Sequence, residues 1–182
     1  MESPRYRCHY AGPVGDDPRT VSVGAVADGL CRIVEVEGPM VAKRAYDIYL
    51  RSCGIKRMGH ELKSTMNKAL ANAMRQGRII SEEESGKGGL LFSVIRIKDS
   101  PPVKLRSRGP RTFEELPPSE LLIVAKYLEV RHKFQAGSDE HLRAILEWFD
   151  LKRLTTQVGT IWLEIIEKRF AYADEYLRDH PE

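Results

Sequence analysis

Three amphipathic helical stretches follow one another in the first 80 residues, and each ends at a glycine. Apolar side chains recur every three or four positions within these stretches, which cover roughly residues 21–37, 42–53 and 59–76. Gly38-Pro39, Gly54 and Gly77 come directly after them. Glycine adopts the left-handed conformation that ends many helices, and proline cannot continue a helix. The sequence therefore predicts three short helices joined by tight turns.

Two β-rich segments follow the third helix. Residues 78–81 and 90–98 are rich in Ile, Val and Phe, and the EEESGKGG segment between them is typical of a loose hairpin tip. The short PMV segment after Gly38 is a candidate third strand. Three helices followed by a β-hairpin form a winged-helix arrangement, a relative of the helix-turn-helix.

The remaining chain divides by composition. Pro and Gly punctuate residues 1–20 and predict a flexible N-terminal arm, so the winged-helix domain is expected over 21–99. Residues 100–117 are basic and Pro-rich, which predicts an extended linker. A helical second unit is expected over 118–182, with helices near 118–133, 138–149 and 155–176 and a helix start at Ser138.

The second unit repeats the first at an offset of 96 residues. GIKRMGHELKSTMNKAL, which begins at Gly54, aligns with DLKRLTTQVGTIWLEII, which begins at Asp150, so that apolar core positions coincide. The alternative is a chance alignment of two amphipathic helix pairs. We expect a mostly α (α+β) protein with tandem winged-helix or helix-turn-helix-like units, of which the first carries the hairpin.

The outward positions of the repeat differ. Ser64, Asn67, Lys68 and Ala71 correspond to Thr160, Leu163, Glu164 and Glu167. Carboxylates at these positions would repel phosphates, so the second copy is expected to contact protein, either another copy of this chain or a different partner. The residues predicted for that contact are Trp162, Leu163, Phe170, Tyr172 and Tyr176.

Positive charge gathers in the first 111 residues. Residues 38–81 contain nine Lys and Arg against two acids, for a local net charge of +7. Residues 96–111 contain six against one, for +5, whereas residues 112–150 carry eight acids against four bases, for −4. Because summed charge decides where a polyanion binds, nucleic acid is expected on the first part of the chain.

A DNA contact is therefore predicted for the third helix, with Asn67 at a base edge and cations at phosphates. The alternative is an ordinary solvated helix face, and for the basic linker a solvated spacer. The hairpin tip at Lys87 is opposed by Glu82-Glu83-Glu84. The predicted DNA-binding residues are Lys56, Arg57, Lys63, Ser64, Asn67, Lys68, Arg75, Arg78, Lys87, Arg106 and Arg108.

Several classes of protein do not fit the sequence. No apolar run approaches the length of a membrane span, and the N-terminus lacks the apolar core of a secretory signal. Three widely spaced cysteines favour the cytoplasm and predict no metal site. Ser64 stands where a zincin needs its second histidine after His60-Glu61, and no phosphate-binding loop is present. No cofactor, small-molecule substrate or enzymatic activity is expected.

The segments EVEGPM, RSCG, IKRMG and RQGRI resemble a domain of unknown function. That domain sits at the C-terminal end of large bacterial helicase–nuclease proteins and in stand-alone relatives, notably from actinobacteria. The resemblance covers about residues 24–81 well and 112–166 faintly. It implies a winged-helix-like module that works near DNA, in defence against foreign DNA or in repair, and it carries over no catalytic residues. Where the family often has an acidic helix cap, this chain has Val41-Ala42-Lys43.

These observations predict a non-enzymatic protein that binds duplex DNA, with a second unit for dimerisation or docking. The alternative is an adaptor subunit of a helicase, nuclease or DNA-defence complex, which would bind a protein partner and bind DNA only weakly. A regulator that senses a ligand is a third hypothesis, for which the sequence offers no sensor pocket.

Overall fold

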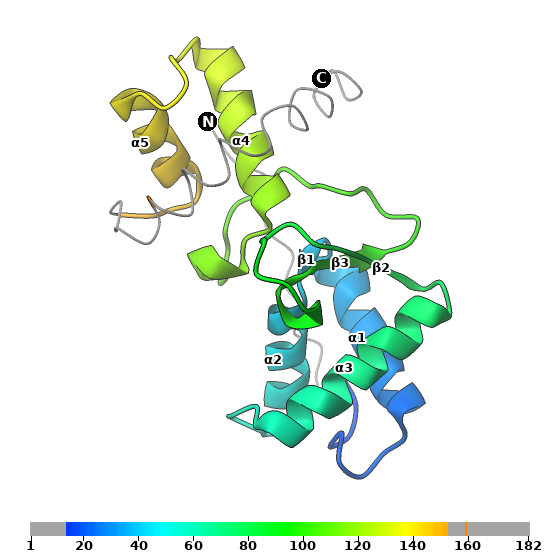
Figure 1. Ribbon diagram of the computed structural model, residues 1–182. Coiled ribbons are helices and arrows are strands. Elements are labelled where there is room, and N and C mark those ends of the chain that lie inside the picture. Colours follow the sequence, from blue (N-terminus) through cyan, green and yellow to red (C-terminus); the bar gives the residue numbers. More distant parts are fainter. Residues whose placement is uncertain (1–13, 153–158, 160–182) are drawn as a thin grey trace. The chain divides into compact units, whose positions relative to one another are not determined.

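The computed structural model describes residues 14–152 and residue 159 of the 182-residue chain (Figure 1). The chain divides into two compact units, with the division between Pro102 and Val103. The described elements are helices and one small antiparallel sheet, so the fold is mixed α and β.

Three helices form the first unit, as the glycine stops predict. They are α1 (Val23–Glu37), α2 (Ala42–Ser52) and α3 (His60–Arg75), and their ends lie within two residues of the predicted ones. The Ser22 hydroxyl accepts a hydrogen bond from the Ala25 nitrogen at 3.2 Å and caps α1. Apolar residues of all three helices face one another in a single core.

The end of α2 shows why Gly54 is needed there. Gly54 has a φ of +77°, and the nitrogens of Gly54 and Ile55 donate to the carbonyl oxygens of Arg51 and Leu50 at 3.0 and 2.8 Å. This pair of bonds is the Schellman arrangement, which satisfies the last free carbonyls of a helix. Ile55 packs against the core, so the chain turns back sharply toward α3.

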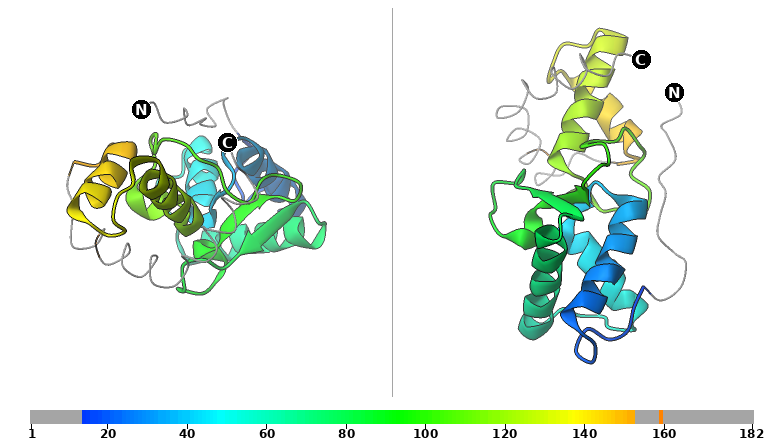
Figure 2. Two further views of the ribbon diagram at one scale, coloured as in Figure 1. Left: turned by 90° about the horizontal axis from the view of Figure 1, so that it is seen from above. Right: turned by 90° about the vertical axis from the view of Figure 1, so that its right-hand side faces the viewer.

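A three-stranded antiparallel sheet completes the unit at one end of the three helices (Figures 1 and 2). Its strands are β1 (Met40–Val41), β2 (Ile79–Glu82) and β3 (Val94–Ile97), in the order β1-β3-β2. Met40 pairs with Ile95, which also pairs with Ser81. The PMV segment thus supplies the third strand.

The second predicted strand begins later than expected. Residues 90–92 form a 3-10 turn, in which the Ser93 nitrogen donates to the Leu90 carbonyl oxygen at 3.3 Å. Gly89, with a φ of +80°, directs the chain out of the loop and into that turn. The apolar side chains of the turn pack against the core without strand pairing. Local composition alone does not distinguish such a turn from a strand.

The prediction of a flexible arm over residues 1–20 is wrong for its last part. Val14 is buried in the core of the first unit, and its nitrogen donates to the Ser52 hydroxyl at 3.4 Å. The Tyr49 hydroxyl donates to the Asp16 carbonyl oxygen at 3.0 Å. These contacts with α2 fix residues 14–16, whereas a composition rich in Pro and Gly predicts only the lack of a regular element.

In the second unit the structure describes α4 (Pro118–His132) and α5 (Asp139–Trp148). Both lie within two residues of their predicted bounds, and the Ser138 hydroxyl caps α5 by accepting from the His141 nitrogen at 3.3 Å. The third helix predicted here, near 155–176, lies outside the described residues apart from residue 159.

The prediction of an extended linker over 100–117 is wrong from Val103 onward. Val103, Phe113 and Leu116 are buried in the core of the second unit, together with residues of α4 and α5. A short 3-10 helix at Phe113–Glu115 begins with a capping box formed by Thr112 and Glu115. The segment therefore belongs to the second unit, because its few apolar residues are the ones that pack.

The bounds of two pairs of described helices agree with the predicted offset of 96 residues. The bounds of α1 and α2 shifted by 96 residues fall within one residue of those of α4 and α5. The nitrogens of Asp150 and Leu151 donate to the carbonyl oxygens of Glu147 and Leu146 at 3.0 and 2.8 Å, the same distances as at the end of α2. Asp150 has a φ of +50° at the position that corresponds to Gly54.

Candidate nucleic-acid interface

The turn between α2 and α3 presents two cations to solvent. Lys56 and Arg57 are exposed, whereas their neighbours Ile55 and Met58 are half-buried and pack against the core. Because the two apolar side chains anchor the turn, the two basic ones are directed outward. This part of the predicted site is exposed as expected.

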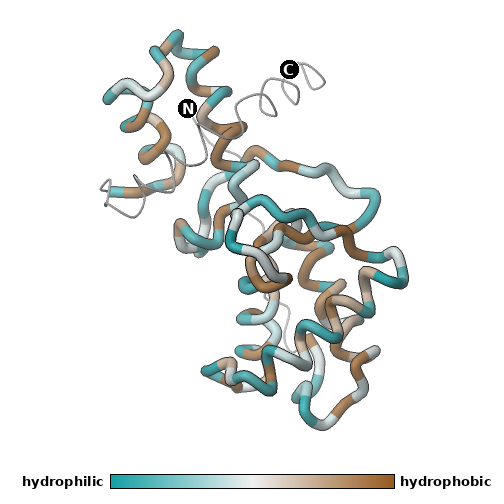
Figure 3. The backbone as a smooth tube through the Cα atoms, viewed as in Figure 1, coloured by the Kyte–Doolittle hydropathy of each residue, from teal (hydrophilic) through white to brown (hydrophobic). Residues whose placement is uncertain are grey.

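One face of α3 builds the core and the other carries polar and basic residues. Hydrophobic and hydrophilic residues alternate along the tube of α3 in Figure 3, as in a helix with one apolar face. The buried residues are Leu62, Met66, Ala69, Leu70 and Ala73. Lys63, Lys68 and Arg75 are exposed, and Ser64 is half-buried. The helix contains one acid, Glu61, in its first turn.

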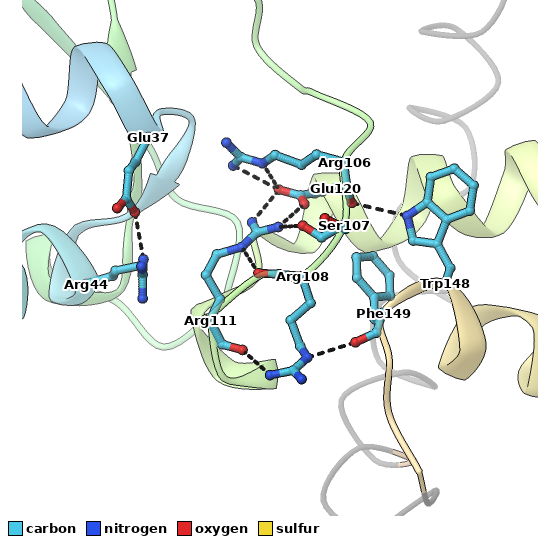
Figure 4. Close-up of polar contacts among 9 residues, drawn as sticks. All are labelled: Glu37, Arg44, Arg106, Ser107, Arg108, Arg111, Glu120, Trp148 and Phe149. Carbon is cyan, nitrogen blue, oxygen red and sulfur yellow. Dashed lines mark hydrogen bonds and ion pairs between the residues drawn. The ribbon is translucent and has the colours of Figure 1, made fainter. Parts of the chain in front are cut away.

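Three of the nine cations in residues 38–81 are paired within the unit. Lys43 lies 2.6 Å from Asp47 and Arg44 lies 2.8 Å from the buried Glu37 (Figure 4). Arg78, which the sequence assigned to DNA, is half-buried and lies 2.6 Å from Asp28. This ion pair partly neutralises its charge and makes it a weaker candidate for a phosphate contact than the sequence indicates.

The other six cations are exposed and make no ion pair within the part of the chain that the structure describes. They are Arg51, Lys56, Arg57, Lys63, Lys68 and Arg75. All belong to the end of α2, the following turn or the outer side of α3. This set, which we call the α3 cation set, is available to a polyanion without the loss of an internal ion pair. Arg51 was not among the predicted site residues, because sequence alone does not separate it from the paired Lys43 and Arg44.

A shallow depression beside α3 brings part of this set together. It is lined by Val23 of α1 and by Lys68, Ala71, Asn72 and Arg75 of α3. Lys68 and Arg75 are two turns apart, about 10 Å along the helix axis. Asn72 was not among the predicted site residues, since only the packing of α1 against α3 shows which flank of the helix is hollow.

Asn67 is held toward the protein interior. Its Oδ1 accepts a hydrogen bond from the hydroxyl of Tyr46 at 3.0 Å, and Tyr46 is fully buried. Burial raises the pKa of Tyr46, so the phenol remains a hydrogen-bond donor. The sequence assigned Asn67 to a base edge, whereas the structure gives its amide oxygen a structural partner.

The hairpin tip holds Lys87 in an ordered loop. Its ammonium lies 5.6 Å from the centre of the Phe92 ring. Glu83 accepts from the nitrogens of Ser85 and Gly86 at 3.0 and 2.8 Å. Its carboxylate therefore stabilises the loop, while Lys87 itself is exposed.

Arg106 and the half-buried Arg108 donate to acceptors inside the second unit, which corrects their assignment to a DNA contact (Figure 4). Arg106 is buried and donates through Nη2 to Glu120 Oε2 at 3.0 Å. Arg111 is fully buried and contacts both oxygens of Glu120, at 2.8 and 2.6 Å. Arg108 donates to the carbonyl oxygens of Phe149 and Arg111, each at 2.7 Å. Three of the six cations in residues 96–111 are therefore bound inside the second unit.

A signal for this network was present in the sequence. Glu120 directly precedes the apolar run from Leu121 to Ala125, all of which is buried. A helical segment that is apolar on every side is a buried one, and a buried carboxylate needs a cationic partner. The nearest cluster of arginines, residues 106–111, supplies it.

The residues predicted for protein contact lie outside the described part of the chain. They are Trp162, Leu163, Phe170, Tyr172 and Tyr176. Their assignment to dimerisation or docking stays a prediction.

The structure adds little chemistry elsewhere in the described residues. Burial raises the pKa of the thiols of Cys31 and Cys53, which makes both less nucleophilic. No group of three His, Cys, Asp or Glu side chains suited to a metal ion occurs among the described residues. In the same part of the chain, every helix is too short or too polar to cross a bilayer.

No family model, curated protein or solved structure matches the chain in the three comparisons made.

Proposed function

We propose that the first unit is a winged helix that binds duplex DNA and catalyses no reaction. Its element order, α1-β1-α2-α3-β2-β3, and its strand order, β1-β3-β2, are those of a winged helix with β2 and β3 as the wing. In this arrangement α3 is the helix that enters the major groove, and α2 lies across the backbone.

The observation that carries the proposal is the α3 cation set. Six exposed cations that make no ion pair among the described residues lie on the end of α2, the turn and the outer side of α3. Each phosphate that such a cation neutralises releases a condensed counterion, which favours binding at low salt. The alternative of an ordinary solvated face does not explain why the cations that are unpaired among the described residues gather on one helix. That helix is the one that a winged helix presents to DNA.

Small residues on the outer face of α3 also favour close approach to a duplex. Ala71 and Ser64 lie between the basic side chains, so no bulky group holds the helix away from the groove. The tip of the wing, with Lys87 exposed, supplies a further phosphate contact in this proposal.

For the second unit we propose a winged-helix-like or helix-turn-helix-like copy of the first that docks to protein. The support is the repeat of two helices and of the turn that ends the second of them, at an offset of 96 residues. In sequence, Glu164 and Glu167 occupy the positions that correspond to Lys68 and Ala71. The basic segment 103–111 has no part in the DNA contact, because Glu120 and backbone carbonyls bind its arginines.

A charge reversal in the depression beside α3 tests the proposal. Lys68→Glu/Arg75→Glu in the full chain is expected to weaken binding to a duplex of about 20 bp by about tenfold or more at roughly 50 mM salt. For the unchanged chain, the slope of log K against log salt should be about −5 if five or six phosphates are neutralised.

Arg32→Glu/Lys98→Glu is the matched control. It changes the net charge by the same amount at two exposed cations outside the depression. It should reduce the affinity by no more than about threefold. Equal affinity of both double variants, or no gel shift with the unchanged chain at low salt, would overturn the proposal and favour the adaptor hypothesis.

A further inference from the structure

The geometry of α3 points to binding of duplex DNA through its phosphates, with little dependence on base sequence. This inference rests on the proposed function and concerns which duplexes the first unit accepts. Three features of α3 carry it: the hydrogen bond of Asn67, the small residues at the middle of the outer face, and the position of its exposed arginine.

Asn67 is the residue on this face best suited to read a base, and its amide oxygen is bound inside the protein. An asparagine reads adenine through both ends of its amide, with the nitrogen donating to N7 and the oxygen accepting from the 6-amino group. Asn67 Oδ1 accepts instead from the Tyr46 hydroxyl at 3.0 Å.

Release of this amide toward a base would leave a buried donor without an acceptor. Tyr46 is fully buried with Asn67 in place, so its hydroxyl depends on Asn67 as its acceptor. An unsatisfied buried donor costs about as much as a good contact with a base gains. A base contact by Asn67 would therefore bring little net gain over the observed inward orientation.

Two positions near Asn67 on this face offer little that reads sequence. Ala71 has no polar atom in its side chain, and Ser64 is half-buried and short. Serine hydrogen-bonds to several bases and distinguishes them poorly. Lys68 and Asn72 carry polar groups nearby, but both line the depression at the flank of α3.

Arg75 is a potential reader of guanine, but it lies in the last turn of α3. In helix-turn-helix proteins the N-terminal part of the recognition helix contacts the base edges. Arg75 instead lines the depression with Lys68 and Asn72, next to Val23 at the start of α1. A depression with two cations two turns apart suits a sugar-phosphate strand that runs along the flank of α3.

The test compares duplexes of equal length and different sequence. The full chain is titrated at one salt concentration with duplexes of about 20 bp that are AT-only, GC-rich or of mixed sequence, and it is then offered a pool of random duplexes for selection. The expected affinities agree within about threefold, and selection enriches no motif, in contrast to the 10³ or greater ratio of a specific site.

Two variants of Asn67 complete the experiment. Asn67→Ala should leave all affinities within about twofold of the unchanged chain, because the side chain makes no base contact. Asn67→Asp keeps an acceptor for Tyr46 if the alanine variant fails to fold, and its added charge should weaken every duplex by the same factor.

One duplex bound about 30-fold more tightly than the others, with that preference lost in Asn67→Ala, would overturn this inference and leave the proposed function intact. Failure to bind any duplex at low salt would overturn both. The two failures are therefore distinguishable in the same titration.

Discussion

Glu120 lies within hydrogen-bonding distance of Arg111 through both carboxylate oxygens, at 2.8 and 2.6 Å, in the interior of the second unit. The same carboxylate accepts from Nε and Nη2 of Arg106 at 3.1 and 3.0 Å. One buried acid thus binds two buried guanidinium groups, and both arginines belong to a segment that its composition marks as a solvated linker.

Glu120→Gln is expected to destabilise the chain strongly. The change keeps the shape of the side chain but removes the only negative charge among these three residues. Loss of one partner from a buried ion pair typically lowers the free energy of unfolding by about 3–5 kcal/mol. Equilibrium urea unfolding of the full chain measures this loss of free energy.

Glu147→Gln is the control for this change, because Glu147 is an exposed acid on α5. Its effect should stay within about 0.5 kcal/mol. A loss of less than about 1 kcal/mol in Glu120→Gln would show that the network is not the main support of this segment.

The helices α1 to α5 that the structure describes could be predicted from sequence, because their signals are local. A glycine or a capping serine and an apolar stripe lie within a few residues of one another, and they place α1 to α5 within two residues of their ends. The end of α2 at Gly54 and the start of α5 at Ser138 are examples.

The pairing of charges could not be predicted in the same way. Arg106 and Lys56 look alike in sequence, yet one is buried beside an acid 14 residues away and the other is exposed. Asn67 and Tyr46 are 21 residues apart, and only the packing of α2 against α3 brings the amide to the phenol. Charge in the sequence therefore indicated α3 as the candidate helix, while the exposure and pairing of each side chain depend on contacts distant in sequence.

Gly54 and Asp150 provide a paired test of the repeated turn. Both have a positive φ, +77° and +50°, at equivalent positions after α2 and α5. A Cβ at Gly54 meets no other atom within 4 Å, so Gly54→Ala should cost only the backbone strain, about 1 kcal/mol. Asp150→Gly should remove such strain and stabilise the second unit by about 0.5 kcal/mol.

Loss of the Asp150 side chain itself should matter little. It is 93% exposed and lies 3.9 Å from Arg108, a distance at which a surface ion pair contributes little. Thermal unfolding of Gly54→Ala and of Asp150→Gly measures the two effects. The same sign for both changes would contradict the equivalence of the two turns.

Gly29 of α1 is expected to reject even a methyl group. A Cβ at this position would collide with Cε2 of the buried Tyr49 ring and lie 3.1 Å from the Val14 carbonyl oxygen. The new methyl group would require both the Tyr49 ring and the Val14 carbonyl to shift. Gly29→Ala should therefore lower the free energy of unfolding by about 1–3 kcal/mol. Chemical denaturation measures the change.

Gly24, in the same helix, is the matched control. A Cβ there would lie 3.8 Å from the Ser22 hydroxyl oxygen, which is ordinary contact. Gly24→Ala should therefore stabilise the chain by about 0.5 kcal/mol through helix propensity. Stabilisation by both substitutions would show that Tyr49 and residues 14–16 can rearrange.

Asp17 is expected to titrate at an unusually low pH. The Arg19 side chain donates to its carboxylate, as does the Arg19 backbone nitrogen, and these hydrogen bonds lower the pKa of Asp17 from 3.8 to about 2. A carboxylate with a lowered pKa contributes stability that is present above pH 3.8 and is lost as the pH falls through about 2. The carboxyl resonance of Asp17, followed by NMR between pH 1.5 and 6, should show this low midpoint.

Arg19→Gln removes the largest cause and keeps the backbone donor, so the midpoint should rise toward 3.8 without reaching it. A midpoint near 3.8 in the unchanged chain would mean that the turn from Asp17 to Thr20 does not hold this ion pair in solution.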